Sequence, residues 1–379
     1  MHLRRPYLNV RVLTVFLIAA VPLSVLGLRI VLSNAQDQLR DSFGRQLEQA
    51  AERTAAAVDA YVYRRIIDVS LLARQPALRD TAAAASRVPY DERRVAELDR
   101  TWTASRAVPP ALASMLQSPA SRLLRDLVQH DPVYREILLT DRHGRLAAVS
   151  SVSTDYFQGD EDWWRAAFED SAAGRVTVSD VRWDDSARVY GLEIASPVPD
   201  TEGQGSAGIL KVVADVREML AVVAGVQTSG SSGAMLVRRD GSIVFSRLPL
   251  APGARFFANG AFQEKLRRPH DPQASHHFAA TSADGRQLVG VAPSQLGLSY
   301  PNLSWFVAVW QAEDELLAPT RAQMWQLLLV LALTGLIVLA LALLFSMRLV
   351  APPTDVDMEL VTHAKVHQID ERDAEEGAR

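Results

Sequence analysis

The stretch "DYFQGDEDWWRAA", residues 155–167, places two adjacent tryptophans behind a tyrosine and a run of carboxylates. Aromatic faces attract cations, and carboxylates accept hydrogen bonds from ammonium groups, so such a segment can line a ligand site. It can also belong to a hydrophobic core or to a catalytic cleft. Trp163 and Trp164 are consecutive at the start of a predicted helix, where both are not expected to point inward. At least one of them is therefore predicted to line a surface or cleft.

Other motifs in the chain offer little further chemistry. The glycines of "GQGSAG", residues 203–208, match a dinucleotide-binding pattern but lie between two strand-like runs, which predicts a hairpin turn. His270, His276 and His277 lie near Asp271, but adjacent strand residues point to opposite faces, which argues against a metal site. The sequence contains no nucleophile elbow, zinc-protease motif or P-loop. The protein is predicted to be no enzyme and to use no metal and no cofactor.

Two apolar segments are predicted to cross a membrane. From Ala322 to Met347 no residue carries a charge over 26 positions, which is long enough for a helix to span the hydrocarbon core. The other segment, residues 12–32, continues past Arg29 and lacks a cleavage pattern, which favours an uncleaved anchor over a signal peptide. The arginines of residues 1–11 favour a cytoplasmic N-terminus.

Between these two predicted spans the spacing of the apolar residues changes once, from a helical pattern to a strand pattern. Residues 33–80 are predicted to form one long amphipathic helix, because apolar side chains recur there at helical spacing. A strand–turn–strand pattern follows, and it appears three times; its turns are at Asp141–Gly144, Asp240–Gly241 and Asp284–Gly285. The Gly and Ser cluster of residues 222–234 marks a loop between two similar modules in tandem.

Composition excludes some classes of protein. The net charge is −4, and no basic stripe indicates nucleic-acid binding. The chain has no cysteine, which leaves neither disulfides nor thiolate metal sites. Residues 348–379 form an acidic tail, predicted to lie in the cytoplasm; from Leu349 onward it has eight acidic and three basic residues. Whether this tail docks on a partner or is disordered stays open.

With these elements in this order, the chain resembles the double Cache family, the extracytoplasmic sensing domains of bacterial chemoreceptors, histidine kinases and cyclases. The resemblance covers residues 34–318. It is carried by Asp155-Tyr156, Trp163–Ala166, "VTVSDVRWDD", "LEIASPVPDTEGQGSAGILKVVADV" and "GAMLVRRDGSIVFS".

The resemblance implies an α+β fold in which a long N-terminal helix precedes two PAS-like modules with antiparallel sheets. The membrane-distal module would span residues 81–222 and the membrane-proximal module 223–318, with the two transmembrane helices flanking them. In that family the distal module holds the ligand.

The resemblance also implies a set of ligand-binding residues. The residues at the positions of the amino-acid-binding branch are Tyr156, Glu161, Trp163, Trp164, Asp184 and Asp215, and Arg182 is a further candidate because of its charge. Asp180 and Asp185 are alternatives to Asp184. Glu161 stands where that branch has an arginine, and a glutamate there would repel a ligand carboxylate that an arginine would bind. This favours an amine, although Arg165 or Arg182 could restore binding of an amino acid, so both ligand classes stay open.

The function expected from these features is that of a two-pass receptor of the bacterial inner membrane with its main domain in the periplasm. It would bind a small molecule, pair as a homodimer along its long helix, and pass the signal to a separate effector protein. The residues after the second span resemble only the first turn of a HAMP linker, and the receptor is expected to lack an output domain of its own. The alternative is a periplasmic scaffold that binds another protein and no small ligand.

Overall fold

A single long helix, α1 (Val10–Ala73), opens the fold and supplies part of its main hydrophobic core. The structure, a computed structural model, describes residues 10–105, 108–200, 205–226, 230–246, 252–257, 260–267 and 274–349. The prediction that this helix reaches residue 80 is wrong, because Gln75 is extended at φ −62° and ψ 132° directly before Pro76. A residue that precedes proline is disfavoured in helical conformation, so α1 ends and α2 (Pro76–Ser86) begins.

The chain divides into two units, Arg40–Leu316 and a second one formed by Met1–Leu39 with Leu317–Arg379. The predicted spans fall within α1 and within α10 (Glu313–Leu349). Across the residues that the structure describes, no helix combines the length and the hydropathy needed to cross a membrane. The acidic tail after Leu349 lies outside the described residues.

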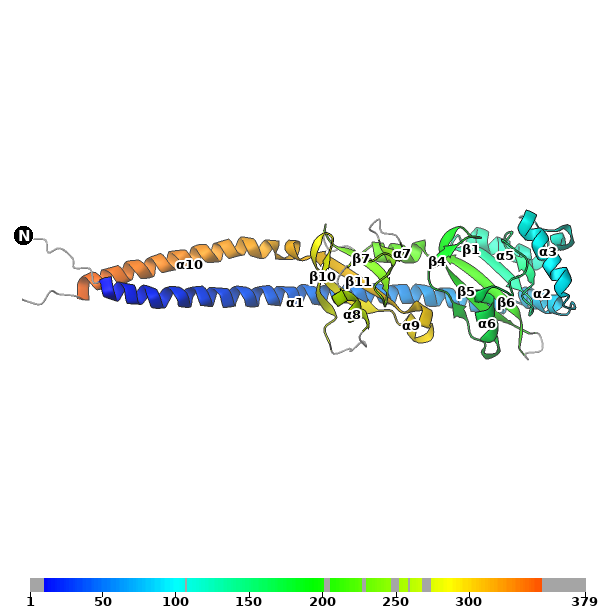
Figure 1. Ribbon diagram of the computed structural model, residues 1–379, viewed down its shortest axis with the longest axis horizontal. Coiled ribbons are helices and arrows are strands. Elements are labelled where there is room, and N and C mark those ends of the chain that lie inside the picture. Colours follow the sequence, from blue (N-terminus) through cyan, green and yellow to red (C-terminus); the bar gives the residue numbers. More distant parts are fainter. Residues whose placement is uncertain are drawn as a thin grey trace, which may run out of the picture. The chain divides into compact units, whose positions relative to one another are not determined.

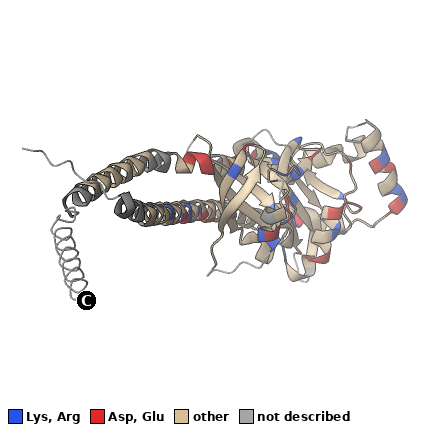
Figure 2. Ribbon diagram, turned by 60° about the vertical axis from the view of Figure 1, so that its left-hand side comes forward, with Lys and Arg blue, Asp and Glu red and all other residues tan. Residues whose placement is uncertain are grey.

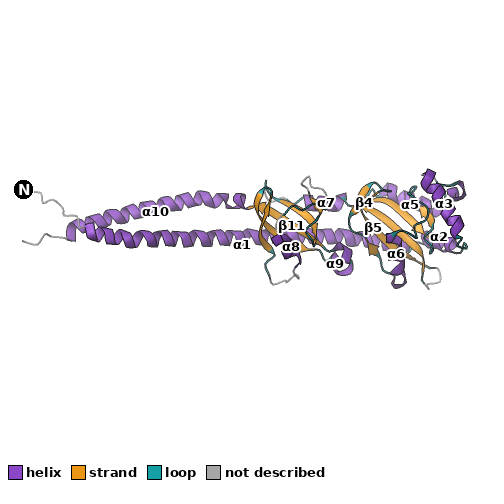
Figure 3. Ribbon diagram, in the orientation of Figure 1, coloured by secondary structure: helices purple, strands orange, loops and turns teal. Residues whose placement is uncertain are grey.

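The unit Arg40–Leu316 contains two antiparallel sheets (Figures 1 and 3). The first, here called the distal sheet, has the order β2-β1-β6-β5-β3, and β4 also pairs with β5. Its strands are β1 (Tyr134–Thr140), β2 (Leu146–Val149), β3 (Thr177–Val178), β4 (Arg182–Asp184), β5 (Val189–Pro199) and β6 (Ser206–Asp215).

The second, or proximal, sheet has the order β8-β7-β11-β10-β9. Its strands are β7 (Gly233–Arg238), β8 (Ile243–Ser246), β9 (His277–Ser282), β10 (Gly285–Pro293) and β11 (Trp305–Ala312). In both sheets a hairpin lies at one edge, and its inner strand pairs with the last strand of the module. The strand orders are β2-β1-β6 in the distal sheet and β8-β7-β11 in the proximal sheet. The prediction of two similar α+β modules is confirmed, and its three turns connect β1 to β2, β7 to β8, and β9 to β10.

Short helices complete both modules. They are α3 (Glu92–Ser105), α4 (Ala113–Leu116), α5 (Pro119–His130), α6 (Asp162–Glu169), α7 (Arg217–Ala224), α8 (Gly260–Arg267) and α9 (Leu296–Ser299). The predicted module boundary after residue 222 falls inside α7 and is wrong. Because α7 packs on β7 and β8, it belongs with the proximal sheet, and the chain changes module at the end of β6. Acidic and basic residues are interspersed over the elements of this unit (Figure 2).

The two faces of the distal sheet are covered differently. On one face, Ile137, Ile194 and Val212 pack in the main core together with Val62 of α1. On the other face, α6 lies over β5 and β6 (Figure 1). Since side chains alternate along a strand, the neighbours of these core residues point toward α6. Those neighbours form the candidate site.

Gly290 of β10 provides a test of how closely the proximal sheet approaches α1. A Cβ atom there would lie 2.3 Å from the Glu48 amide nitrogen and 2.4 Å from the Leu47 carbonyl carbon. Because backbone atoms cannot move aside locally, we expect Gly290→Ala to lower the free energy of unfolding by at least about 2 kcal/mol. Chemical denaturation of the full-length chain measures this change.

Gly260 supplies the matched control, since a Cβ there would meet nothing within 4 Å. Gly260→Ala, at the first position of α8, is expected to change the stability by no more than about 0.5 kcal/mol. Equal effects of the two substitutions would contradict the close approach of β10 and α1.

Candidate functional site

The helix α6 carries the tryptophan pair onto the distal sheet. Trp163 and Trp164 are both buried, each with 8% of its surface exposed. The expectation that at least one of them lines a surface or cleft is therefore wrong. Consecutive helical residues are only about 100° apart, and a helix lying flat on a sheet buries a stripe at least that wide, so both side chains face it.

Trp164 is fixed by contacts that stabilise the module. Its Nε1 donates to the Thr140 hydroxyl at 2.9 Å. Its ring stacks on Phe168 with 4.7 Å between centroids. The Thr140 hydroxyl also accepts from the Ile209 amide at 3.2 Å and so joins β1 to β6. These contacts assign Trp164 to packing and leave Trp163 as the indole beside charged groups.

Trp163 lies over a buried lysine. The Nζ of Lys211, on β6, is 5.1 Å from the centroid of the Trp163 ring. The same Nζ is 3.6 Å from Asp184 Oδ2 and 3.4 Å from Glu193 Oε1. The lysine is only 7% exposed, and a cation at that depth requires carboxylate partners of this kind.

A third carboxylate, Glu136 of β1, joins this group and is 1% exposed. One of its oxygens accepts from the Ser186 hydroxyl, while the other, Oε2, has no hydrogen-bond partner among the described residues. Burial raises the pKa of Glu136 to about 7, with Asp184 and Glu193 adding to the rise and the Ser186 hydrogen bond and Lys211 opposing it. Glu136, Asp184, Glu193 and Lys211 are called the Lys211 cluster below.

Strand register brings the cluster together. Val213 is paired with Glu136 of β1 and with Glu193 of β5, so both glutamates share its face of the sheet. Lys211, two residues before Val213, shares that face as well. Asp184 reaches the group from β4, whose neighbour along the sheet is β5. A shift of one residue in any of these strands would send its charged side chain into the main core instead.

The edge of the cluster toward solvent is formed by Arg182. Its guanidinium is paired with Glu193 Oε2, and half of the side chain, 51%, is exposed. Asp184 is held in addition by the Ala187 amide, which donates to its Oδ1 at 2.7 Å. The site thus contains three carboxylates and two cations, with Arg182 as its outermost charge.

Three of the candidate ligand-binding residues named from the sequence therefore meet at this cluster, namely Trp163, Arg182 and Asp184, with Trp164 beside them. Tyr156 does not, because it is buried in a separate group and its ring stacks on Trp102 at 6.2 Å. Glu161 is exposed at the N-terminus of α6, and its side chain makes no capping hydrogen bond.

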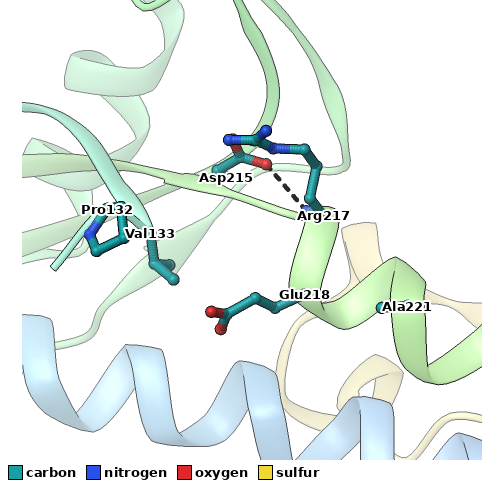
Figure 4. Close-up of a pocket in the computed structure, with 6 residues that line it drawn as sticks. All are labelled: Pro132, Val133, Asp215, Arg217, Glu218 and Ala221. Carbon is teal, nitrogen blue, oxygen red and sulfur yellow. Dashed lines mark hydrogen bonds and ion pairs between the residues drawn. The ribbon is translucent and has the colours of Figure 1, made fainter.

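Asp215 lies apart from the cluster, at the end of β6. It is 4% exposed, and it accepts from the Arg217 amide at 2.9 Å and from Arg217 Nε at 2.8 Å. Together with Arg217 it lines a cavity of about 320 Å³, into which Glu218 extends from α7 opposite Val133 (Figure 4). Asp215 therefore lines a cavity that no member of the Lys211 cluster lines.

Three central residues of the site, Glu136, Glu193 and Lys211, were not among the predicted site residues. A signal for them exists in the sequence. Each is a charged residue inside a mostly apolar strand, in "REILLT", "LEIASPV" and "ILKVVADV". Charged residues at inward positions are rare unless they are paired or functional. Their partners became evident only with the register of three strands.

The histidines considered for a metal site have other contacts. His277 lies 3.2 Å from Glu48 and 3.1 Å from Asp41 of α1. His270 and Asp271 lie outside the described residues. Among the residues that the structure does describe, no group of His, Cys, Asp and Glu is arranged to hold a metal ion.

No model of a known protein family matches the chain, and no curated protein sequence matches it. Several solved structures do. One is the ligand-binding domain of the amino-acid chemoreceptor PctB of Pseudomonas aeruginosa PAO1, in complex with L-Arg. It is 17% identical to this chain, the alignment covers 73% of this chain and 97% of that one, and the TM-score is 0.44. The ligand-binding domain of the chemoreceptor CtaA of Pseudomonas fluorescens, in complex with L-serine, is 16% identical over 73% and 99% of the chains, with a TM-score of 0.45.

A third similar structure is the sensor domain of the histidine kinase DctB of V. cholerae, at 14% identity over 72% and 97% of the chains and a TM-score of 0.46. These three structures are the ligand-binding domains of two chemoreceptors and the sensor domain of a histidine kinase.

Proposed function

We propose that this protein is a membrane-anchored sensor whose distal module binds a small molecule with a primary ammonium group at the Lys211 cluster. The observation that carries the proposal is Glu136 Oε2, a buried carboxylate oxygen without a hydrogen-bond partner among the described residues. A buried acceptor left unpaired costs free energy, and such groups in a folded protein call for a functional or structural reason. An ammonium donor from a ligand would supply the missing hydrogen bond.

The charges of the site support a cationic ligand. When Glu136 is ionised, the three carboxylates are matched by two cations among the described residues, Lys211 and Arg182, so this group carries one excess negative charge. The Trp163 ring, which Lys211 Nζ already faces at 5.1 Å from its centroid, adds the negative potential of its face to the same region. Both features favour a ligand that brings a positive charge.

Arg182 gives a ligand access to the Lys211 cluster, and it is also a second group that can bind the ligand. Its half-exposed guanidinium is the outermost partner of Glu193, so a ligand ammonium can take its place on that carboxylate. The released guanidinium would then be available for a ligand carboxylate, which arginine binds with two parallel hydrogen bonds. The same site can therefore hold an amine, and it can hold an amino acid with Arg182 as the partner of its carboxylate.

The helix α1 connects the distal module to the rest of the chain. Its Arg65 contacts Asp131 at 3.1 Å in the distal module, and its Asp59 accepts from the Gln295 amide at 2.8 Å in the proximal module. We propose that ligand binding shifts this helix, and that the apolar segments 12–32 and 322–347 anchor the chain in the inner membrane as a homodimer that signals to a separate effector. Binding can move such an equilibrium only by its difference in affinity for the two states.

A matched set of three compounds tests the ligand class on the full-length chain. L-alanine carries both charged groups, ethylamine keeps only the ammonium, and propionate keeps only the carboxylate. We expect ethylamine or L-alanine to raise the melting temperature and to bind in calorimetric titration, and propionate to leave this site empty. Glu136→Gln should weaken ammonium binding by about tenfold, since the negative charge that strengthens the hydrogen bond from the ammonium group is lost.

Glu169→Gln is the control for this test, because Glu169 is exposed at the end of α6 and lies away from the cluster. It should leave the affinity unchanged. Arg182→Gln should weaken L-alanine and leave ethylamine bound. If neither ammonium compound binds, or if Glu136→Gln binds as the unsubstituted protein does, the proposal fails.

A further inference from the structure

A second cavity lies between the distal and the proximal sheet, within the unit Arg40–Leu316. Its volume is about 540 Å³, within the usual range of small-molecule pockets. Residues of β5 and α7 form one part of its wall, and Val244, Phe245 and Ser246 of β8 form the other. It is separate from the Lys211 cluster, none of whose members line it.

The lining of this cavity combines an apolar wall with an excess of positive charge. Val189, Leu220, Val244 and Phe245 supply apolar surface. Among the lining side chains three are arginines, and they face a single acid, Asp215; the arginines are Arg135, Arg188 and Arg217. Such a lining disfavours cations and suits an anion that has an apolar part.

The single acid of the cavity is already neutralised. Asp215 accepts a hydrogen bond from the Arg217 amide at Oδ1 and another from Arg217 Nε at Oδ2, and Arg135 Nε stands 4.0 Å from Oδ2. The side chain of Arg188 pairs with no carboxylate among the described residues. Arg135 and Arg188 therefore leave guanidinium groups that a bound anion can engage.

The backbone of Arg188 gives an independent reason to look for a role of its side chain. Arg188 has φ +53°, and it is the one residue other than glycine with a positive φ in the described chain. Side chains with a Cβ are strained in this region, where glycine or asparagine is the ordinary choice. A strained residue of this kind that lines a cavity points to a function of the side chain.

We propose that the cavity between the two modules binds a small organic monocarboxylate with a short apolar body, held by Arg188 and Arg135. The carboxylate would face the guanidinium groups, and its apolar part would lie along Leu220, Val244 and Phe245. This site would be independent of the ammonium site beneath Trp163.

The position of the cavity gives the proposed ligand a means to influence the sensor. The two sheets are otherwise joined here through Asp180, which accepts from Trp305 Nε1 at 2.9 Å and pairs with Arg238. A ligand that contacts both β5 and β8 adds a further connection at the same place. It would favour whichever arrangement of the modules keeps both walls in contact with it.

The test uses 4-fluorobenzoate as the probe and ¹⁹F NMR titration of the full-length chain, at constant ionic strength maintained with sodium chloride. We expect saturable binding that is weakened at least about tenfold by Arg188→Gly and by Arg135→Gln, as the charge-assisted hydrogen bonds are lost. Arg188→Gly is informative because glycine suits this backbone. The variant should unfold at the same temperature as the unsubstituted chain or at a higher one, so lost binding cannot be attributed to lost folding.

Arg94→Gln serves as the control, since Arg94 is an exposed arginine on α3 that is paired with Glu97. It should bind the probe as the unsubstituted chain does. Probe binding that does not saturate, or that is equal in Arg188→Gly and in the unsubstituted chain, would overturn the proposal. Glu136→Gln must leave probe binding unchanged, which keeps this outcome separate from the test of the ammonium site.

Discussion

Replacing Lys211 with methionine is expected to lower the free energy of unfolding by about 3–5 kcal/mol, the usual cost of removing one partner from a buried ion pair. Methionine has a similar length and packs beneath the Trp163 ring, so the loss of charge rather than of volume dominates. Asp184 and Glu193, 7% and 5% exposed, would remain in the interior without their central cation. Chemical denaturation of the full-length chain measures the loss.

Lys265 provides a control of the same residue type. It is exposed on α8, and its Nζ lies 5.7 Å from the centroid of the Phe278 ring, so it shares the cation–π contact but not the burial. Lys265→Met should cost no more than about 1 kcal/mol. If both substitutions have equally small effects, Lys211 is not buried among carboxylates as described.

A second substitution tests whether the charges act as a unit. Adding Glu193→Gln to Lys211→Met removes one of the stranded carboxylates, so the double variant is expected to be more stable than Lys211→Met alone. Residues in one ion-pair network commonly show coupling free energies of about 0.5–3 kcal/mol. Additive effects would mean that Lys211 and Glu193 do not interact.

Glu136→Gln is expected to remove a large pH dependence of stability. The pKa of Glu136 is raised from 4.5 to about 7 by its burial, so the folded state keeps a proton that the unfolded state loses above pH 4.5. The stability contributed by this group is fully present below pH 4.5 and is lost as the pH rises to about 7. The total loss amounts to roughly 3 kcal/mol by the linkage between pKa shift and folding.

Glutamine keeps the size of the side chain and cannot ionise. Above about pH 7, Glu136→Gln should therefore be more stable than the unsubstituted chain by up to roughly 3 kcal/mol, and near pH 4 the two should be alike. Denaturation midpoints measured from pH 4 to pH 8 give the difference directly. The pKa of Asp155 is raised to about 6, so this group titrates in the same pH range. It does so in both proteins, and its contribution therefore cancels when their free energies of unfolding are compared. If the stabilities of the two proteins change with pH in parallel, the pKa of Glu136 is not raised by burial.

The same titration bears on the proposed ligand. Deprotonated Glu136 is the form that accepts an ammonium donor, so a bound amine stabilises the ionised state. The proposal therefore implies that amine affinity rises as the pH increases through the pKa of Glu136 at about 7. The predicted gain in stability of Glu136→Gln and its loss of amine binding would then have one cause, a buried carboxylate whose Oε2 has no hydrogen-bond partner among the described residues.

Local sequence patterns predicted the main elements of the fold. Alternating strands with Asp-Gly turns predicted the hairpins of both modules, and helical spacing of apolar residues predicted α1, because these signals depend on neighbours a few residues apart. The end of α1 was predicted too far along the chain, although Pro76 was a visible signal for it. The order of the strands in each sheet, by contrast, depends on contacts between distant segments.

The sequence by itself determined that this protein has two similar α+β modules, a long N-terminal helix and a tryptophan pair beside carboxylates. Only the tertiary structure decided which charges surround those indoles. Lys211, Glu136 and Glu193 meet because three strands align in one register, and Asp215 points to a different cavity although it belongs to the same strand as Lys211. The physical reason is that the pairing partner of a buried charge is selected by its distance in space, and residues far apart along a chain become neighbours only when the sheet has formed.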